Sequence, residues 1–159
     1  MWEADNQIRS IADCRQVAER GNLAAITQME TQSMSETEAV GDGKLTTLSV
    51  GEVKSLYDKN DVVLIDVRTP AEYALEHIGG ALLAPMSGFD PARLPTQTEE
   101  RPIVLYCGSG MRSRKMAEKY LAAGFAKIAH MAGGFGAWKQ AGNGFLGTDP
   151  ATGASVPRP

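Results

Sequence analysis

The sequence predicts an α/β fold with a mostly parallel central sheet and helices on both faces. Two short apolar runs, at residues 61–65 and 103–106, have the continuous hydrophobic character of strands that are buried on both sides. Segments with helix caps and helical periodicity lie between and after these runs. Such alternation of strand and helix along a chain is typical of a parallel sheet whose crossovers are helical.

The first helices of this core are marked by their caps. The segment Ser49–Glu52 has the pattern of a capping box and predicts a helix to about Lys59. Thr69 and Glu72 form a second such pattern, with Pro70 at the first helical position, so a short helix is expected to end near His77. The other short elements expected here are a strand or bridge at residues 81–84 and one helical turn at residues 90–94.

The later elements surround a glycine-rich segment. The strand at residues 103–106 leads into this segment, and a helix follows from residue 114 to residue 123. Its apolar stripe consists of Met116, Ala117, Tyr120 and Leu121. Gly124 ends the helix, and the last expected elements are a strand over residues 125–131 and a short helix over residues 137–141.

The two ends of the chain differ from this core in composition. Residues 1–33 carry apolar side chains at loosely helical spacing, interrupted by Gly21-Asn22, and are expected to form a helical extension. Residues 34–43 are polar and acidic and are interpreted as a linker. The core domain is then expected over residues 44–142, with a C-terminal tail over residues 143–159.

Composition limits the classes of function. A length of 159 residues suits one domain beside its extension, and a net charge of -3 argues against general nucleic-acid binding. The chain has no apolar run of transmembrane length and opens without a signal-peptide pattern, so we expect no membrane contact and a cytoplasmic location, or a periplasmic one if a signal was removed. Two cysteines, Cys14 and Cys107, do not make a disulfide scaffold.

The segment from Cys107 to Ser113 is the candidate site. Cys107 ends a buried strand, and the glycines Gly108 and Gly110 let successive backbone N–H groups converge on one point. The positive end of the following helix and the Arg112 guanidinium add to this field. Together they favour a thiolate over a thiol, and the thiolate is the reactive form of cysteine. The residues expected to form the loop and line it are Gly108, Ser109, Gly110, Met111, Arg112 and Ser113.

This unit resembles the active-site loop of rhodanese-type sulfurtransferases, and the match extends over roughly residues 45–142. Three other segments resemble signatures of the same family in the expected order: residues 64–68 with Glu72-Tyr73, residues 77–81, and residues 133–138. The resemblance implies the rhodanese-like fold, with a five-stranded, mostly parallel sheet. Related phosphatases carry one more residue between cysteine and arginine, so the four intervening residues here favour sulfur chemistry.

The resemblance implies sulfur transfer through a persulfide on Cys107. The expected donors are thiosulfate, persulfide or polysulfide, with Arg112 binding the anionic donor, and the expected acceptor is cyanide or a thiol. No cofactor or metal is required, and His77 and His130 are too isolated to suggest a metal site. The alternative is a sulfur-carrier or regulatory module that delivers sulfur to a dedicated protein partner. Residues 1–33 are a candidate surface for homo-oligomer contact.

Several further residues have supporting or open roles. Asp66, Arg68 and Glu72 are expected to act as scaffolding beside the cleft, with Arg68 paired to a carboxylate such as Glu72. Cys14 is either a resolving thiol that accepts sulfur from Cys107 or a helix cysteine without a role, and we favour the second because no neighbour in the sequence activates it.

Overall fold

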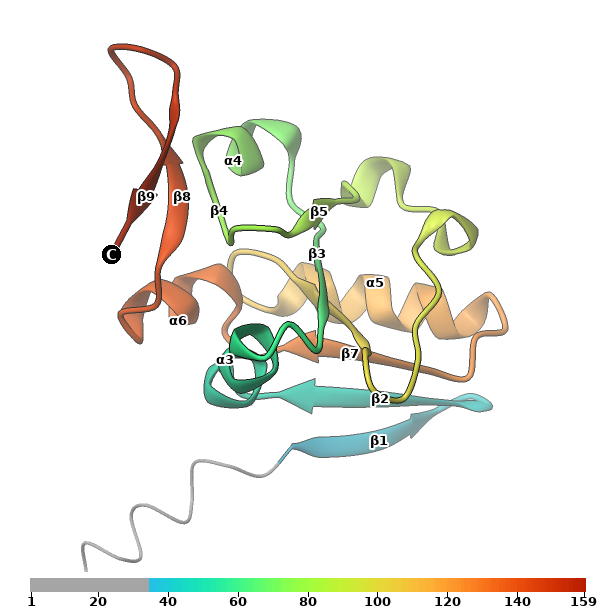
Figure 1. Ribbon diagram of the computed structural model, residues 1–159. Helices are drawn as coiled ribbons and strands as arrows, with labels where there is room; N and C mark the ends of the chain where they lie inside the picture. The colour runs from blue at the N-terminus through green and yellow to red at the C-terminus, as the bar shows by residue number, and fades with distance from the viewer. Residues whose placement is uncertain (1–34) are drawn as a thin grey trace, which may run out of the picture. The chain divides into compact units, whose positions relative to one another are not determined.

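Five parallel strands and one antiparallel strand form the central sheet of the computed structural model, which describes residues 35–159. Figure 1 shows the strands with helices packed around them. The expected five-stranded parallel sheet is confirmed, and β1 adds a sixth, antiparallel strand at one edge. In their order across the sheet, the strands are β1 (Glu36–Val40), β2 (Gly43–Leu48), β7 (Lys127–Met131), β6 (Ile103–Tyr106), β3 (Val63–Asp66) and β5 (Leu82–Leu83).

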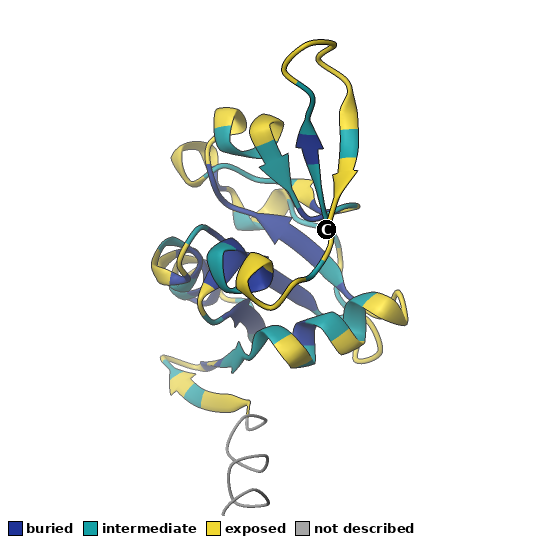
Figure 2. Cartoon of the chain, turned by 90° about the vertical axis from the view of Figure 1, so that its left-hand side faces the viewer, coloured by how far each residue is buried: buried dark blue, intermediate teal, exposed yellow. Residues whose placement is uncertain are grey.

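Helices cover both faces of this sheet, as predicted. Helix α5 (Met111–Ala122) packs on one face, and its predicted stripe of Met116, Ala117, Tyr120 and Leu121 is buried there. Helices α3 (Val50–Asp58) and α6 (Gly134–Gln140) pack on the other face through residues such as Val53 and Trp138. The central strands are consequently among the most buried parts of the chain (Figure 2).

Both predicted capping boxes are present. Ser49 and Glu52 cap the start of α3, and Thr69 and Glu72 cap α4 (Pro70–Leu75), with Pro70 in its first turn. Helix α4 ends before His77, because Glu76 takes an extended backbone and enters strand β4 (Glu76–His77). Two short 3₁₀ helices, η2 (Met86–Gly88) and η3 (Pro91–Arg93), follow β5.

The linker expected over residues 34–43 is wrong for Glu36–Val40, which form strand β1. Every residue of β1 pairs with β2, and Gly41 makes the turn between them with a φ of 60°. The side chains of β1 are mostly exposed, so the strand lacks an apolar pattern that the sequence could reveal. Its position depends on backbone hydrogen bonds to β2, and an ion pair between Glu38 and Arg114 of α5 adds to them.

The expected C-terminal tail also contains strands. Strands β8 (Phe145–Thr148) and β9 (Ser155–Arg158) form an antiparallel hairpin, and β8 pairs with β4 to complete a second sheet. The predicted helical extension over residues 1–33, with Cys14, lies outside the described residues. Among residues 35–159, none of the helices has both the length and the apolar character needed to cross a membrane.

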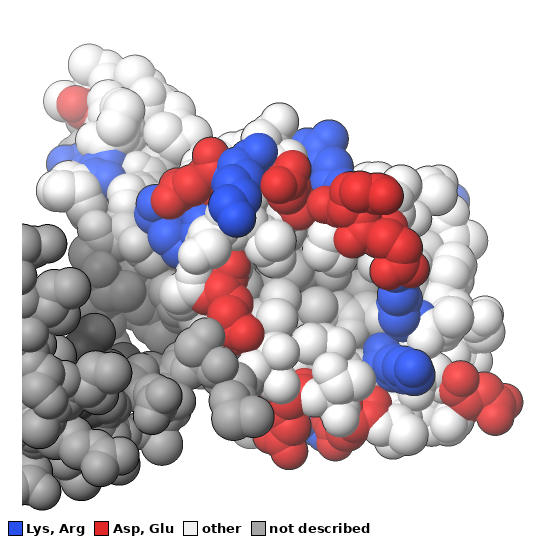
Figure 3. Space-filling model, turned by 60° about the horizontal axis from the view of Figure 1, so that its bottom comes forward, with Lys and Arg blue, Asp and Glu red and all other residues white. Residues whose placement is uncertain are grey.

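Charged side chains of both signs are interspersed on the face drawn in Figure 3. Several of these charges are paired. Arg114 forms ion pairs with Glu38 and with Glu118 one helical turn later, and Lys139 pairs with Glu76. Exposed pairs of this kind each contribute little to stability.

Candidate active site

Cys107 lies where the sequence predicts, directly after β6 at the carboxyl end of the parallel strands. Its side chain is fully buried, and the Gly110 N–H donates a hydrogen bond to its sulfur at 3.1 Å. Gly110 has a φ of 95°, in the left-handed region that glycine enters without steric cost. The loop therefore needs glycine at this position to turn its N–H inward.

The surroundings of Cys107 favour the thiolate. Burial opposes ionisation, but hydrogen bonds from the backbone of Ser113, from Ser109, from the Ser113 hydroxyl and from Gly110 outweigh it and lower the pKa of Cys107 below its ordinary value of 9.0. These donors come from the loop and from the first turn of α5, which also directs the positive end of its dipole toward the sulfur. The structure thus provides the cradle that the glycine spacing predicts.

A second backbone segment holds this loop in place. The N–H groups of Phe135 and Gly136 donate to the carbonyls of Cys107 and Gly108 at 2.7 and 2.9 Å. A Cβ on Gly134 would lie 2.3 Å from the Cys107 carbonyl oxygen, so the two backbones meet without room for a side chain. The start of α6 therefore holds the active-site loop in position through backbone hydrogen bonds.

Arg112 is fixed by Glu72. Its two terminal nitrogens, Nη1 and Nη2, donate to the two carboxylate oxygens of Glu72 at 2.9 and 2.7 Å. The hydrogen bond from Arg112 lowers the pKa of Glu72 to about 2, and that pairing together with the nearby Cys107 thiolate raises the pKa of Arg112. Two of the five guanidinium N–H donors are used in this pair, which leaves others for an anionic ligand.

Arg68 pairs with a carboxylate, as predicted, but its partner is not Glu72, the residue given as the example. Arg68 instead binds Asp66, with Nη2 2.6 Å and Nε 3.0 Å from Oδ2, and its Nη2 also donates to the Glu76 carbonyl. Its guanidinium lies over the Phe135 ring at 4.5 Å from the centroid. Asp66 is close enough to take the buried charge, whereas Glu72 is engaged by Arg112. The pair connects β3 to the Glu76 carbonyl in β4 and to the Phe135 ring in α6, and the scaffolding role of both residues stays a prediction.

Ser109 and Met111 are the exposed residues of the segment from Cys107 to Ser113. The Met111 side chain is 72% accessible. By contrast, Ser113 is fully buried at the first turn of α5. The predicted loop residues thus divide into an exposed part and a buried part.

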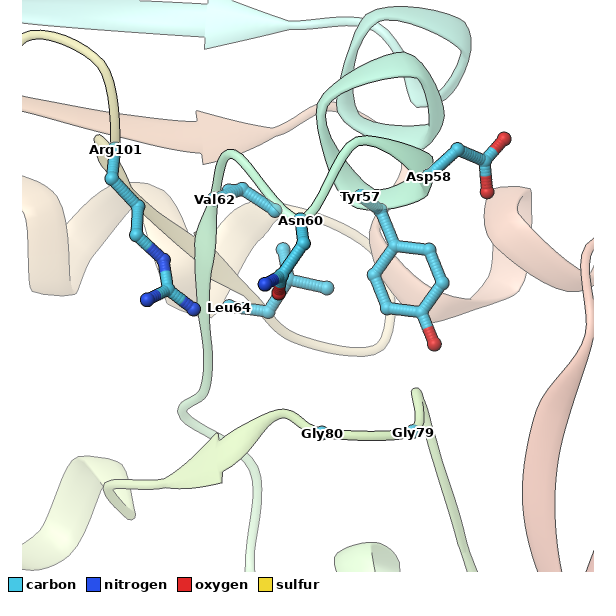
Figure 4. Close-up of a pocket in the computed structure, with 8 residues that line it drawn as sticks. All are labelled: Tyr57, Asp58, Asn60, Val62, Leu64, Gly79, Gly80 and Arg101. Carbon is cyan, nitrogen blue, oxygen red and sulfur yellow. The ribbon is translucent and has the colours of Figure 1, made fainter.

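A separate pocket of about 460 Å³ lies at the other end of the parallel strands (Figure 4). It is bordered by Tyr57 in the last turn of α3 and Asn60 just after it, by Gly79-Gly80, and by Arg101 just before β6. Cys107 is not among its lining residues, since it follows the opposite end of β6. Pocket volume therefore does not locate the nucleophile in this protein, whereas the loop chemistry does.

Sequence reasoning missed one contact of the site. His130, interpreted as isolated, lies 3.4 Å from the Ser113 hydroxyl through Nδ1. These residues are 17 positions apart and belong to β7 and α5. Only the order of strands in the sheet could have revealed the contact, because no local motif contains both residues.

Comparisons with known proteins agree with this geometry. A model of the Rhodanese-like domain family matches residues 49–141, more than half of the chain. The uncharacterized protein slr1261 of Synechocystis is 41% identical over 96 residues, which are 60% of this chain and 53% of that protein. The chain thus spans about half the length of that relative.

Two further proteins bear on function and fold. The thiosulfate sulfurtransferase GlpE of Pseudoalteromonas translucida is 35% identical over 95 residues, covering 59% of this chain and 89% of that enzyme. The solution structure of the rhodanese-like domain of Alr3790 from Anabaena has a TM-score of 0.54 at 24% identity, covering 61% of this chain and 75% of that domain, and it supports the fold alone. The chain therefore belongs to the rhodanese-like domain family, with sulfurtransferases among its relatives.

Proposed function

We propose that this protein is a sulfurtransferase that carries sulfane sulfur as a persulfide on Cys107. The observation that carries the proposal is the Cys107 sulfur inside a ring of N–H donors, with the Gly110 N–H at 3.1 Å. The same hydrogen bonds that lower the pKa of Cys107 would stabilise the terminal sulfur of a persulfide anion. The similarity to a named thiosulfate sulfurtransferase supports this assignment.

The proposed reaction has two half-reactions. The Cys107 thiolate attacks the outer sulfur of thiosulfate, a new S–S bond forms, and the original S–S bond breaks as sulfite leaves with its electron pair. A nucleophile such as cyanide then attacks the terminal sulfur, which gives thiocyanate and restores the thiolate. Covalent catalysis of this kind predicts ping-pong kinetics.

Arg112 is the proposed anchor for an anionic donor. Its side chain remains 35% exposed, so a ligand can reach the guanidinium, and Glu72 fixes the orientation of that group. The loop from Cys107 to Ser113 contains no second cation. A donor with less charge than thiosulfate, such as a persulfide or polysulfide, therefore also fits the proposal.

The exposed Met111 favours a second candidate function, in which the acceptor is a dedicated protein. A flexible, polarizable side chain with 72% accessibility beside the nucleophile is suited to contact a protein surface. In that case Cys107 would load sulfur stoichiometrically and turn over only with its partner. Multiple turnover with cyanide or a small thiol would favour the enzyme.

Steady-state kinetics with thiosulfate and cyanide test the enzyme directly. We expect thiocyanate formation with parallel double-reciprocal lines, and its complete loss in Cys107→Ser. The matched control is Ser55→Ala, an equally small change in α3, away from the loop, which should keep its turnover. Unchanged turnover in Cys107→Ser would refute the role of this residue.

A further inference from the structure

A chain of hydrogen-bonding groups lies behind the active-site loop. The Ser113 hydroxyl donates to the Gly110 carbonyl at 3.0 Å and lies 3.4 Å from His130 Nδ1. On its other side, His130 Nε2 is 3.1 Å from the Thr47 hydroxyl. Gly110 in turn donates its N–H to the Cys107 sulfur. The contacts thus connect a side chain of β2 to the nucleophile through β7, α5 and the loop.

The register of the sheet explains why these groups meet. His130 stands opposite Thr47 of β2 and opposite Leu105 of β6 in parallel strands, so all three side chains share one face. Cys107 follows two residues after Leu105 and belongs to that same face, which α5 covers. His130 is therefore positioned under the first turn of α5 by the strand order.

The Ser113 hydroxyl has one proton and three neighbours that could accept it. These are the Gly110 carbonyl, the Cys107 sulfur and His130 Nδ1. If Nδ1 carries no hydrogen, it competes for the proton. If Nδ1 is protonated, it donates to the hydroxyl oxygen, and the Ser113 proton stays available for the carbonyl or the sulfur. The tautomer of His130 thus determines whether the Ser113 hydroxyl can donate its proton to the Gly110 carbonyl or the Cys107 sulfur.

The surroundings of His130 keep its ring neutral. Its side chain is 5% exposed, and burial and then the charge of Arg114 lower its pKa, against smaller opposing effects of Glu38 and Glu118. In a neutral ring only one nitrogen carries a hydrogen. The Thr47 hydroxyl can either donate to Nε2 or accept from it, and donation places the single ring hydrogen on Nδ1.

We propose that His130 is a positioning residue of the sulfur-transfer site: as the Nδ1–H tautomer, held by Thr47, it leaves the Ser113 proton to the Gly110 carbonyl or the Cys107 sulfur. This inference rests on the proposed function only in taking Cys107 as the nucleophile. It assigns His130 no contact with the donor. Its effect reaches the sulfur through Ser113, whose single proton is then shared between the Cys107 sulfur and the Gly110 carbonyl instead of being drawn to His130.

Two substitutions of His130 separate this role from packing. An asparagine amide can place an N–H near the position of Nδ1, whereas a glutamine amide reaches only toward the position of Nε2 and Thr47. We therefore expect His130→Asn to keep the Cys107 pKa of the wild type and His130→Gln to raise it by roughly half to one unit. The measurement is the thiolate absorbance of Cys107 against pH, in a Cys14→Ser background. A glutamine variant that titrates like the wild type, or an asparagine variant shifted as far as glutamine, would overturn the proposal.

A double-mutant cycle tests whether His130 acts through Ser113. Ser113→Ala is expected to raise the pKa of Cys107, and adding His130→Gln to it should raise the pKa no further. Ile128→Val, a buried change on the same face of β7, serves as the packing control and should leave the titration unchanged. Additive shifts from Ser113 and His130 would show that His130 acts by another route and would refute the mechanism.

The tautomer itself can be observed in the wild type by ¹⁵N NMR of the imidazole nitrogens. The chain has only two histidines, and the His130→Asn spectrum assigns the signals of each. We expect Nδ1–H at His130, and a predominant Nε2–H would overturn the proposal. Neither readout requires sulfur transfer, so a protein that fails to load sulfur but shows these shifts would refute the proposed function and leave the inference standing.

Discussion

Glu72 binds Arg112 with both carboxylate oxygens, across 40 positions of sequence. The same carboxylate also closes the capping box of α4, where it accepts hydrogen bonds from the backbone N–H and hydroxyl of Thr69 at 2.9 Å. One side chain thus links the start of α4 to the far end of the active-site loop. The geometry of Arg112 depends on an element that lies outside the loop itself.

This link predicts a pH-dependent contribution to stability. The pKa of Glu72 is about 2 in the folded protein, against an ordinary value of 4.5, so its pairing stabilises the fold above pH 4.5 and is lost as the pH falls toward 2. Glu72→Gln keeps the capping pattern but removes the charge. Because the pair is about one-third exposed and screened by solvent, we expect a loss of about 1 kcal/mol in the free energy of unfolding at pH 6.

Urea unfolding at a series of pH values measures this effect. The matched control is Glu52→Gln, since Glu52 closes the capping box of α3 and has no arginine partner among residues 35–159. The difference between wild type and Glu72→Gln should shrink as the pH falls from 4.5 to 2. A difference that is equal for both glutamines, or constant with pH, would argue against a stabilising role for the Arg112 pair.

Removing the Arg112 guanidinium should weaken use of the anionic donor. We expect Arg112→Ala to raise the KM for thiosulfate by about tenfold, the effect of losing one moderately strong contact. Arg112→Lys keeps the charge but loses the bidentate geometry with Glu72. Its KM for thiosulfate should lie between that of the wild type and that of Arg112→Ala. Arg114→Ala, a neighbouring cation paired with Glu38 and Glu118, is the control. An unchanged KM for thiosulfate in Arg112→Ala would show that Arg112 does not bind the donor.

Gly134 should tolerate no side chain. A Cβ there would lie 2.3 Å from the Cys107 carbonyl oxygen and 2.9 Å from the Gly110 nitrogen, so Gly134→Ala must displace the loop. We expect a loss of stability of about 3 kcal/mol and the loss of sulfur transfer. Gly142→Ala provides the control, since Gly142 also has a positive φ but a Cβ there meets nothing within 4 Å. That control should lose about 1 kcal/mol and keep its activity.

The reactivity of Cys107 should rise with pH through a midpoint below that of an ordinary cysteine. Loop hydrogen bonds lower the pKa of Cys107 despite its burial, so the thiolate persists below pH 9.0 and disappears as the pH falls through the lowered pKa. The rate of alkylation in a Cys14→Ser background, followed by mass spectrometry, measures the midpoint. A midpoint at or above pH 9.0 would mean that the effect of burial on the pKa of Cys107 outweighs that of the loop hydrogen bonds.

The parts of the fold that the sequence predicts are those with local signals. The capping boxes at Ser49 and Thr69 and the turn from Cys107 into α5 each lie within a few consecutive residues. Their geometry follows from backbone conformation and short-range hydrogen bonds, so the structure agrees with the sequence at the two capping boxes. Helix α5 is expected from residue 114 but begins at Met111, directly after the left-handed Gly110, so Met111, Arg112 and Ser113 belong to its first turn. Strand β1 escaped prediction because an exposed edge strand is stabilised by its neighbour's backbone rather than by an apolar pattern.

The polar pairs of the site could not be assigned from the sequence. Arg68 has a carboxylate two positions before it and another four positions after it, and only the structure shows that it binds Asp66. The partner of Glu72 comes from a different helix, and that of His130 comes from helix α5, which packs over its strand. Such choices depend on strand order and side-chain direction, which composition and spacing do not contain.

The most direct test of the persulfide mechanism is the intact mass of the reduced protein after incubation with thiosulfate or polysulfide. We predict that the wild type gains one sulfur atom, that cyanide removes it, and that Cys107→Ser gains none. A wild-type mass that stays unchanged with every donor, or an equal gain in Cys107→Ser, would contradict the assignment of Cys107 as the sulfur carrier.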